Sequence, residues 1–252
     1  GAGQPCHSAF RRTVMTRRLA VIPARGGSKR IAHKNLRQFG GQPAFTHILG
    51  AAAQSELFDI IHVSTDDEAI AQAAALAGFP PGFDRDTNLA DDHTPIRSVV
   101  SWVLRQYEER GEMFDTVALL YATAFFVTPE ALTDACETFE SGDRSQPLLG
   151  VVEVGTPLEK LFRLEDGLLA TVDAAKFGAR TQDLTPVFRD AGAFGIFDAA
   201  SLLSDGDGAQ PLAFRAFPLA PWVGIDIDTE EDWAFAERLH AGGMALQFKD
   251  RS

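Results

Sequence analysis

The chain has 252 residues, 45% of them hydrophobic, and a formal net charge of −12 from 35 acidic and 23 basic side chains. This length and composition predict one large domain with a sizeable core, and the excess of acid argues against a protein that binds nucleic acids or anionic membranes in general. No apolar run approaches the roughly 18 residues of a membrane span, and there is no secretory h-region, so we expect a cytoplasmic protein.

Residues 1–14 have the character of an extraneous or disordered tag, and Met15 is the expected natural start of a single domain over residues 15–252. The two cysteines, Cys6 and Cys136, make no disulfide framework or zinc motif, and Cys136 has the spacing of a core residue on a helix. The six histidines also lack metal-binding spacing.

The first predicted element is a short buried strand over residues 19–22. It breaks at Pro23 and opens into a loop with paired glycines, which let the backbone turn its N–H groups toward a phosphate. The loop and the residues after it are rich in polar and basic side chains: Arg25, Ser28, Lys29, Arg30, Lys34 and Asn35. We interpret this segment as a phosphate site. The alternative is a turn with a solvated basic rim, since neither common glycine-rich nucleotide motif is present.

The next elements alternate between helices and strands. Apolar spacing predicts helices over residues 43–54, 68–77, 96–109 and 129–139, and strands over residues 60–64, 116–120 and 148–154. This order predicts a mostly parallel sheet with helices on both faces and a ligand site beyond the carboxyl ends of the strands.

Several polar residues fall at or near that edge. Thr65, Asp66 and Asp67 follow the predicted strand over residues 60–64 and either cap a helix or contact a ribose. Arg85 lies in an acidic, turn-rich segment, where it either pairs with a neighbouring aspartate or binds an anion.

Residues 147–190 are richer in turns, and we expect a lid, a substrate wall or a dimer arm there. Arg180, Gln182 and Asp190 form a polar group typical of sites that bind a carboxylate and hydroxyls, although an exposed loop would have the same composition.

Residues 223–233 are predicted to form a strand followed by a helix, with Thr229 as N-cap and Asp232 completing a capping box. In a strand, Asp226 and Asp228 would face the same side and could share one cation. Two carboxylates with substrate phosphates suit Mg²⁺. The alternative is an acidic strand end with capping aspartates.

Residues 22–31, 34–35, 63–67, 89–92 and 225–233 together resemble the signature of cytidylyltransferases that activate nine-carbon acidic sugars. The likeness covers about residues 19–239 and is greatest to the pseudaminic acid branch. It implies a Rossmann-like three-layer α/β/α nucleotidyltransferase fold, with residues 147–190 as a dimerisation or sugar-binding extension and a homodimer as the assembly.

The resemblance also implies a reaction, in which the anomeric hydroxyl of the sugar attacks the α-phosphorus of CTP in the presence of Mg²⁺. It implies catalytic roles for Arg25, Lys29, Asp226 and Asp228, the last two as metal ligands. The implied nucleotide-binding residues are Ala24, Arg25, Gly26, Gly27, Ser28, Lys29, Lys34, Asn35, Thr65, Asp66 and Arg85. The implied sugar-binding residues are Tyr121, Thr123, Arg180, Gln182, Asp190 and Phe194.

The chain departs from the family pattern near the expected sugar pocket, at Phe125, Arg189, Ala193 and residues 195–197. These departures leave open a sialic, legionaminic or eight-carbon sugar acid as the acceptor. A catalytically silent nucleotide-binding protein on the same scaffold is the remaining alternative.

Overall fold

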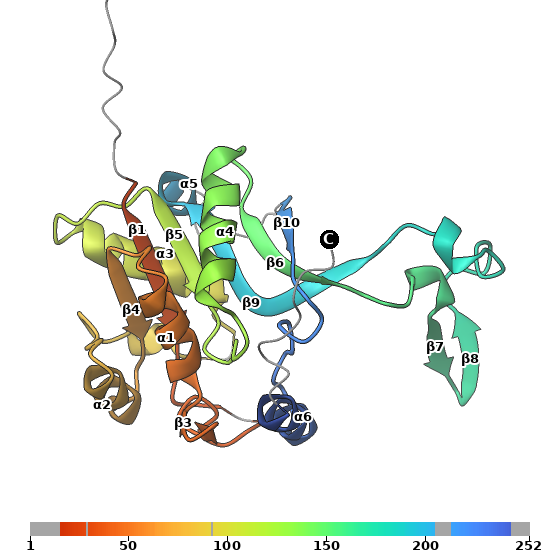
Figure 1. The fold of residues 1–252 in the computed structure, drawn as a ribbon, viewed down its shortest axis with the longest axis horizontal. Helices are drawn as coiled ribbons and strands as arrows, with labels where there is room; N and C mark the ends of the chain where they lie inside the picture. The colour runs from red at the N-terminus through yellow and green to blue at the C-terminus, as the bar shows by residue number, and fades with distance from the viewer. Residues whose placement is uncertain (1–15, 29, 92, 205–212, 243–252) are drawn as a thin grey trace, which may run out of the picture.

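A computed structural model describes residues 16–28, 30–91, 93–204 and 213–242. The predicted tag over residues 1–14, together with Cys6 and Lys29, lies outside these ranges. The described chain is built around a six-stranded sheet (Figure 1). In spatial order the strands are β10 (Arg215–Pro218), β6 (Leu148–Glu153), β9 (Phe188–Asp198), β5 (Thr116–Leu120), β1 (Arg18–Pro23) and β4 (Ile60–Ser64).

The sheet is mostly parallel, as predicted. β1 lies between β4 and β5 and runs parallel to both, and β10 runs parallel to β6. The exception is β9, which is antiparallel to both β5 and β6. Because β1, β4 and β5 share one direction, the loops that follow them all leave the sheet at the same edge.

Side chains of β1 alternate between two separate cores, one on each face of the sheet. Ala20 and Ile22 belong to a cluster with α1 (Phe45–Gln54), α2 (Glu68–Leu76) and α4 (Pro129–Ser141). Leu19 and Val21 belong to a second cluster with α3 (Ile96–Glu108) and α5 (Ala199–Ser204). The helices therefore cover both faces, which explains why the inner strands are almost continuously apolar.

The buried Cys136 confirms the predicted core position of this cysteine on α4, and burial raises the pKa of its thiol to about 12. Among the described helices, none has both the length and the apolar character needed to cross a bilayer.

The helix predicted over residues 43–54 begins later, at Phe45, because Gln42–Pro43 (β3) pairs with Gln38–Phe39 (β2) in a small hairpin. The predicted strand before Thr229 is wrong, since residues 224–228 have no regular secondary structure. Two carbonyl groups of this segment accept hydrogen bonds from side chains instead of a neighbouring strand. Arg189 donates to Gly224 O at 2.6 Å, and Lys34 donates to Ile227 O at 2.7 Å.

The capping box predicted at the start of the last helix is confirmed. Thr229 accepts a hydrogen bond from the backbone N–H of Asp232, and the Asp232 carboxylate accepts one from the backbone N–H of Thr229. This box begins α6 (Glu230–Ala241), which buries Trp233 and Ala236 in a third apolar cluster beside Phe39 and Ile227.

Residues 154–187 leave the sheet between β6 and β9 and form an arm that projects away from the body (Figure 1). The arm carries a hairpin of β7 (Phe162–Glu165) and β8 (Leu168–Thr171), and short 3₁₀ turns at Leu158–Lys160 and Thr181–Asp183. Large apolar side chains on the hairpin are exposed, among them Leu164, Leu168 and Leu169.

Candidate active site

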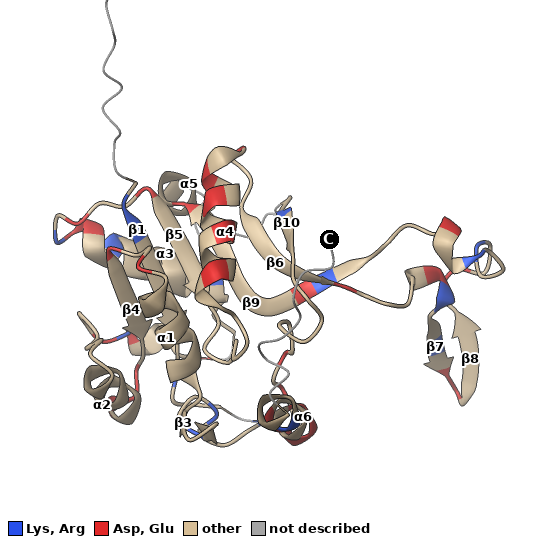
Figure 2. Cartoon of the chain, viewed as in Figure 1, with Lys and Arg blue, Asp and Glu red and all other residues tan. Residues whose placement is uncertain are grey.

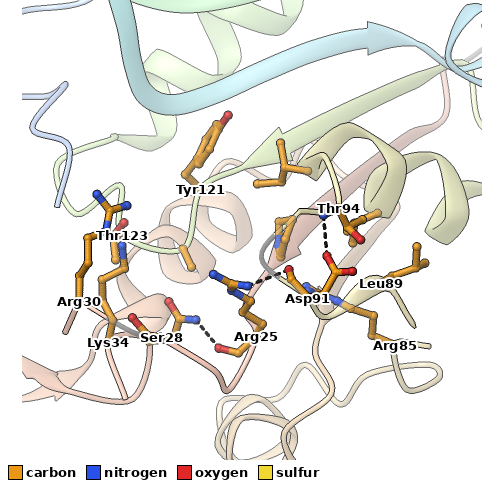
Figure 3. Close-up of a pocket in the computed structure, with 15 residues that line it drawn as sticks. Arg25, Ser28, Arg30, Lys34, Arg85, Leu89, Asp91, Thr94, Tyr121 and Thr123 are labelled. Atoms are coloured by element: carbon orange, nitrogen blue, oxygen red, sulfur yellow. Dashed lines mark hydrogen bonds between the residues drawn. The ribbon is translucent and has the colours of Figure 1, made fainter. Parts of the chain in front are cut away.

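A cavity of about 290 Å³ opens at the edge of the sheet where β1, β4 and β5 end (Figure 3). Its wall comes from the loop after β1, from the segment before α3 and from the residues after β5. The lining residues are Pro23, Arg25, Ser28, Arg30, Lys34, Asn35, Arg85, Leu89, Asp91, Thr94, Ile96, Val99, Tyr121, Ala122 and Thr123.

Hydrogen bonds from three directions fix the glycine loop after β1. The backbone N–H of Ala24 donates to Ser64 O at 2.9 Å, and that of Gly26 donates to Asp66 Oδ1 at 3.2 Å. The Asn35 side chain donates to Arg25 O at 2.9 Å. Asn35 is buried, so this bond ties the two ends of the loop together. The loop is therefore a fixed turn that presents Arg25 and Ser28 to the cavity.

Thr65 and Asp66 support the loop and do not line the cavity. The Thr65 hydroxyl accepts a hydrogen bond from the backbone N–H of Asp67, whose own side chain caps α2. Helix capping, one of the two roles left open by the sequence, is present at Asp67, and contact with a ribose stays a prediction.

Arg85 lies on the cavity wall and is almost completely buried. Its guanidinium donates to the hydroxyl and carbonyl oxygens of Ser64, at 3.1 and 2.5 Å. Burial lowers its pKa to about 10. Its hydrogen-bond partners are neutral, and the negative charge of the nearby Asp66 partly opposes the effect of burial on its pKa, so a bound anion would stabilise the buried cation further. The alternative of a local pair with a neighbouring aspartate does not occur.

The segment before α3 supplies cavity residues that our sequence analysis did not assign, including Leu89, Asp91 and Thr94. Asp91 Oδ1 accepts backbone N–H bonds from His93 and Thr94, which folds the segment into a turn. Arg25 then donates to Asp91 O at 2.8 Å. Residues 89–92 were part of the family resemblance, and that resemblance was the only sequence signal that this segment contributes to the cavity wall.

Cations line this cavity although the chain as a whole is acidic. Arg25, Arg30, Lys34 and Arg85 all contribute to its wall. Figure 2 shows acidic residues in bands along α4, on the outside of the body. The cavity is thus a local positive region that favours a polyanionic ligand.

Asp226 and Asp228 lie beside the cavity and do not line it. Arg30 and Lys34 connect the two regions. Arg30 Nη1 lies 2.6 Å from Asp228 Oδ2, while Lys34 Nζ donates to the carbonyl of the intervening Ile227. Burial lowers the pKa of Lys34, and the nearby Asp228 and Asp226 oppose that change.

The two carboxylates fit a divalent cation only together with further oxygen ligands. The pKa of Asp226 is raised, first by burial and then by the negative charge of Asp228. A cation between them would relieve this repulsion. Among the described residues, no group of three or more His, Cys, Asp and Glu side chains could hold a metal by itself. Substrate phosphates would have to complete the ligand set, as is usual for Mg²⁺.

The predicted sugar-binding residues fall in four places. Tyr121 and Thr123 line the cavity, and the pKa of Tyr121 is raised to about 12, first by burial and then by Asp190 and Asp226. Asp190, on β9, accepts a hydrogen bond from the backbone N–H of Gly192 at 2.8 Å. Phe194 is fully buried in the core.

Arg180 and Gln182 lie on the projecting arm and not among the cavity residues. Their proposed contact with a sugar therefore stays a prediction. Of the predicted nucleotide-binding residues, one cavity brings together Arg25, Ser28, Lys34, Asn35 and Arg85.

Comparison with known proteins agrees with this geometry. A family model described as Cytidylyltransferase matches residues 19–191. A pseudaminic acid cytidylyltransferase from Campylobacter jejuni is 34% identical over 223 residues, which cover 88% of this chain and 95% of that protein. A CMP-N,N'-diacetyllegionaminic acid synthase from Legionella pneumophila is 31% identical over 234 residues, which cover 88% of this chain and 95% of the relative.

Among solved structures, a CMP:2-keto-3-deoxy-manno-octonic acid synthetase complexed with CTP superposes with a TM-score of 0.69. The match covers 90% of this chain and all of the other, at 16% sequence identity. At that identity the likeness concerns the fold alone.

Proposed function

The chain belongs to the cytidylyltransferase family, and we propose that it transfers CMP from CTP to the anomeric hydroxyl of a nine-carbon acidic sugar. Pseudaminic acid is the proposed acceptor, because two relatives that are 34% identical to this chain bear that activity in their names. Legionaminic acid is the second candidate, since a synthase for its CMP derivative is 31% identical.

One observation carries the proposal: a cavity lined by four cations adjoins two carboxylates at the carboxyl edge of a parallel sheet. A triphosphate would place its negative charge among Arg25, Arg30 and Lys34, which can each form charge-assisted hydrogen bonds to phosphate oxygens. The buried Arg85 adds a fixed positive charge deeper in the same wall. Phosphoryl transfer depends chiefly on such positioning and charge neutralisation.

In the proposed reaction the anomeric oxygen of the sugar attacks the α-phosphorus of CTP. A new oxygen–phosphorus bond forms, the bond to the bridging oxygen breaks, pyrophosphate leaves, and the proton of the anomeric hydroxyl is released to solvent. The loop residues Arg25 and Ser28, with the predicted phosphate ligand Lys29, would hold the triphosphate in line. Asp226 and Asp228 would hold Mg²⁺, which when bound supplies charge stabilisation for the phosphates.

The sugar would enter between the nucleotide and the start of β9, where Asp190 lies. Tyr121 has a neutral hydroxyl at physiological pH, because its pKa lies near 12. It can therefore donate a hydrogen bond to the sugar, and Asp190 can accept bonds from sugar hydroxyls. The proposed contact from Arg180 and Gln182 requires a second copy of the chain whose arm reaches this region.

A homodimer is the proposed assembly for the same reason. The hairpin of β7 and β8 exposes Leu164, Leu168 and Leu169, and an isolated two-stranded hairpin is marginally stable in water. A second copy that packs against this arm would bury the exposed leucines and stabilise the hairpin.

The test is pyrophosphate release with CTP and Mg²⁺ from a panel of sugar acids: pseudaminic, legionaminic, N-acetylneuraminic and 3-deoxy-manno-octulosonic acid. We expect release with pseudaminic acid and production of its CMP derivative, detected by mass spectrometry. Release only with another acid would retain the reaction and change the substrate. No release with any acid, from a folded protein that binds CTP, would support the catalytically silent alternative.

A further inference from the structure

Arg30 takes part in two regions of the site at once. Its side chain lines the cavity, next to Lys34 and Thr123 (Figure 3). Its Nη1 atom also lies 2.6 Å from Asp228 Oδ2, which makes it the ion-pair partner of a proposed metal ligand. The sequence placed Arg30 in the predicted phosphate segment, but the family resemblance assigned it no individual catalytic or binding role.

A guanidinium in this position competes with a metal ion for the carboxylate. A short charge-assisted hydrogen bond uses the same oxygen lone pairs that a divalent cation needs. Two positive charges side by side on one carboxylate would also repel each other. Metal binding at Asp228 is therefore stronger when Arg30 moves away from Oδ2.

Lys34 is less able to move than Arg30. Its ammonium group is largely buried and donates to Ile227 O at 2.7 Å, so it is held in place by the backbone. The side chain of Arg30 is 68% exposed, and it is free to reorient at little cost in buried surface. The triphosphate-binding cavity that it lines offers an alternative anion within its reach.

We propose that Arg30 is an exchangeable counter-ion, which pairs with Asp228 in the free protein and moves to the triphosphate when CTP binds. The inference rests on the proposed function, because it assumes that CTP and a divalent metal share this site. Its consequence is positive cooperativity: CTP removes Arg30 from the metal ligand, and metal binding in turn releases Arg30 for CTP. Linkage requires the two effects to be equal.

The expected effect is modest, because the ion pair is partly exposed. Exposed pairs contribute little in water, so removal of Arg30 should tighten metal binding to the free protein by about two- to five-fold. The same change should weaken CTP binding, because a phosphate ligand is lost. Tighter metal binding together with weaker CTP binding distinguishes a residue that exchanges between the two ligands from one with a purely structural role.

The experiment measures Mn²⁺ binding to the full chain by the electron paramagnetic resonance signal of free Mn²⁺, without and with CTP. Binding of Mn²⁺ by CTP itself is measured without protein and subtracted. The variants are Arg30→Ala, Asp228→Ala and the matched control Arg37→Ala. Arg37 forms a similar close pair, with Glu230 at 2.6 Å, next to but outside the two proposed metal ligands.

We expect Arg30→Ala to bind Mn²⁺ more tightly than the wild type in the absence of CTP, and to show a smaller gain on adding CTP. Arg37→Ala should bind Mn²⁺ like the wild type. Equal tightening in both arginine variants would indicate a general charge effect and overturn the inference.

Two further outcomes distinguish a failure of the proposed Arg30 exchange from a failure of the proposed metal site. Weakened Mn²⁺ binding in Asp228→Ala with no change in Arg30→Ala would overturn the exchange and leave the metal site standing. Unchanged Mn²⁺ binding in Asp228→Ala would remove this carboxylate from the metal site, and the inference would fall with it.

Discussion

Gly26 in the loop after β1 lies directly against Asp67, the N-cap of α2. A Cβ atom added to Gly26 would sit 2.9 Å from Asp67 Cβ and nearer still to its carboxylate. The Asp67 side chain meanwhile accepts hydrogen bonds from the N–H groups of Ala69 and Ile70. The close approach therefore couples the shape of the predicted phosphate loop to the start of a helix.

This contact predicts different results for the two adjacent glycines. Gly26→Ala should displace Asp67 and lower the free energy of unfolding by about 1–2 kcal/mol, the usual value of an N-cap. Gly27→Ala should change it by less than about 0.5 kcal/mol, because among the described residues, apart from its two chain neighbours, no atom lies within 4 Å of the added methyl group. Urea denaturation of both variants tests this. Equal losses would mean that the loop does not depend on the contact with Asp67.

Removal of a proposed metal ligand should abolish turnover without unfolding the protein. Asp228→Ala should lower kcat about 10²–10³-fold, since charge stabilisation of the phosphates is lost. Its melting temperature should stay within a few degrees of the wild type, because the side chain is 33% exposed. Glu231→Ala, which removes a nearby exposed carboxylate of α6, is the control and should retain activity. Mg²⁺-dependent pyrophosphate release that survives in Asp228→Ala would exclude the metal role.

Tyr121→Phe should affect the sugar and not the nucleotide. The variant keeps the ring in the cavity and removes only a hydroxyl, so we expect KM for the sugar to rise about five-fold, corresponding to one hydrogen bond. KM for CTP should change less than two-fold. Because the pKa of Tyr121 is near 12, the wild-type KM for the sugar should show no inflection from this hydroxyl between pH 7 and 10. A larger rise in KM for CTP would place the hydroxyl on the nucleotide instead.

The buried His62 predicts a stability that depends on pH. It stacks on Phe83, hydrogen-bonds the Tyr107 hydroxyl at 3.0 Å, and has a pKa lowered to about 4 by burial and by the charges of Arg85 and Arg110. In the unfolded chain the pKa of His62 would be about 6.5. Between about pH 4 and 6.5 the unfolded state therefore binds more protons than the folded state. Stability should therefore be lost as pH falls from about 6.5 to 4, by up to about 3 kcal/mol.

The measurement is the urea midpoint at pH 7.5 and pH 5 for wild type and His62→Phe. The variant should lose less stability on acidification, because phenylalanine cannot be protonated. The control is His33→Asn, because His33 is exposed and has a positive φ, which asparagine tolerates. The urea midpoint of this variant should change between pH 7.5 and pH 5 as much as that of the wild type. An identical pH response of all three proteins would exclude His62 as the cause.

The exposed leucines of the projecting arm lead to a prediction about the oligomeric state. Leu168→Glu places a charge on an apolar side chain that is 75% exposed in one chain, and it should convert a dimer into a monomer in light-scattering measurements. Sugar-dependent turnover should fall with it, while CTP binding should persist. Leu76→Glu changes an even more exposed leucine on α2 and should leave the mass unchanged. A wild-type chain that is already monomeric would contradict the homodimer.

Local pattern was enough to predict much of this protein. The buried runs of β1 and β5, the helices with apolar faces and the capping box of Thr229 and Asp232 all depend on neighbours a few residues away. Such periodicities and caps are encoded in the order of residue types. The glycine-loop motif was also local, and it indicated the correct edge of the sheet.

Contacts across the chain could not be predicted in the same way. Arg25 reaches a carbonyl 66 residues away, and Lys34 one 193 residues away. The sequence also suggested a strand for Asp226 and Asp228, because alternation along the chain does not reveal whether a partner strand is available. Side chains of Lys34 and Arg189 satisfy that backbone instead.

The sequence by itself determined most of the elements, the glycine loop after β1 and the family resemblance, because each rests on residue types at short, fixed spacing. Only the tertiary structure decided that Arg30 meets Asp228, that Arg85 is buried against Ser64 and that Arg180 lies on an arm away from the cavity. The physical reason is that these relationships depend on how the loops converge at one sheet edge, which is set by strand order and packing and by no local pattern.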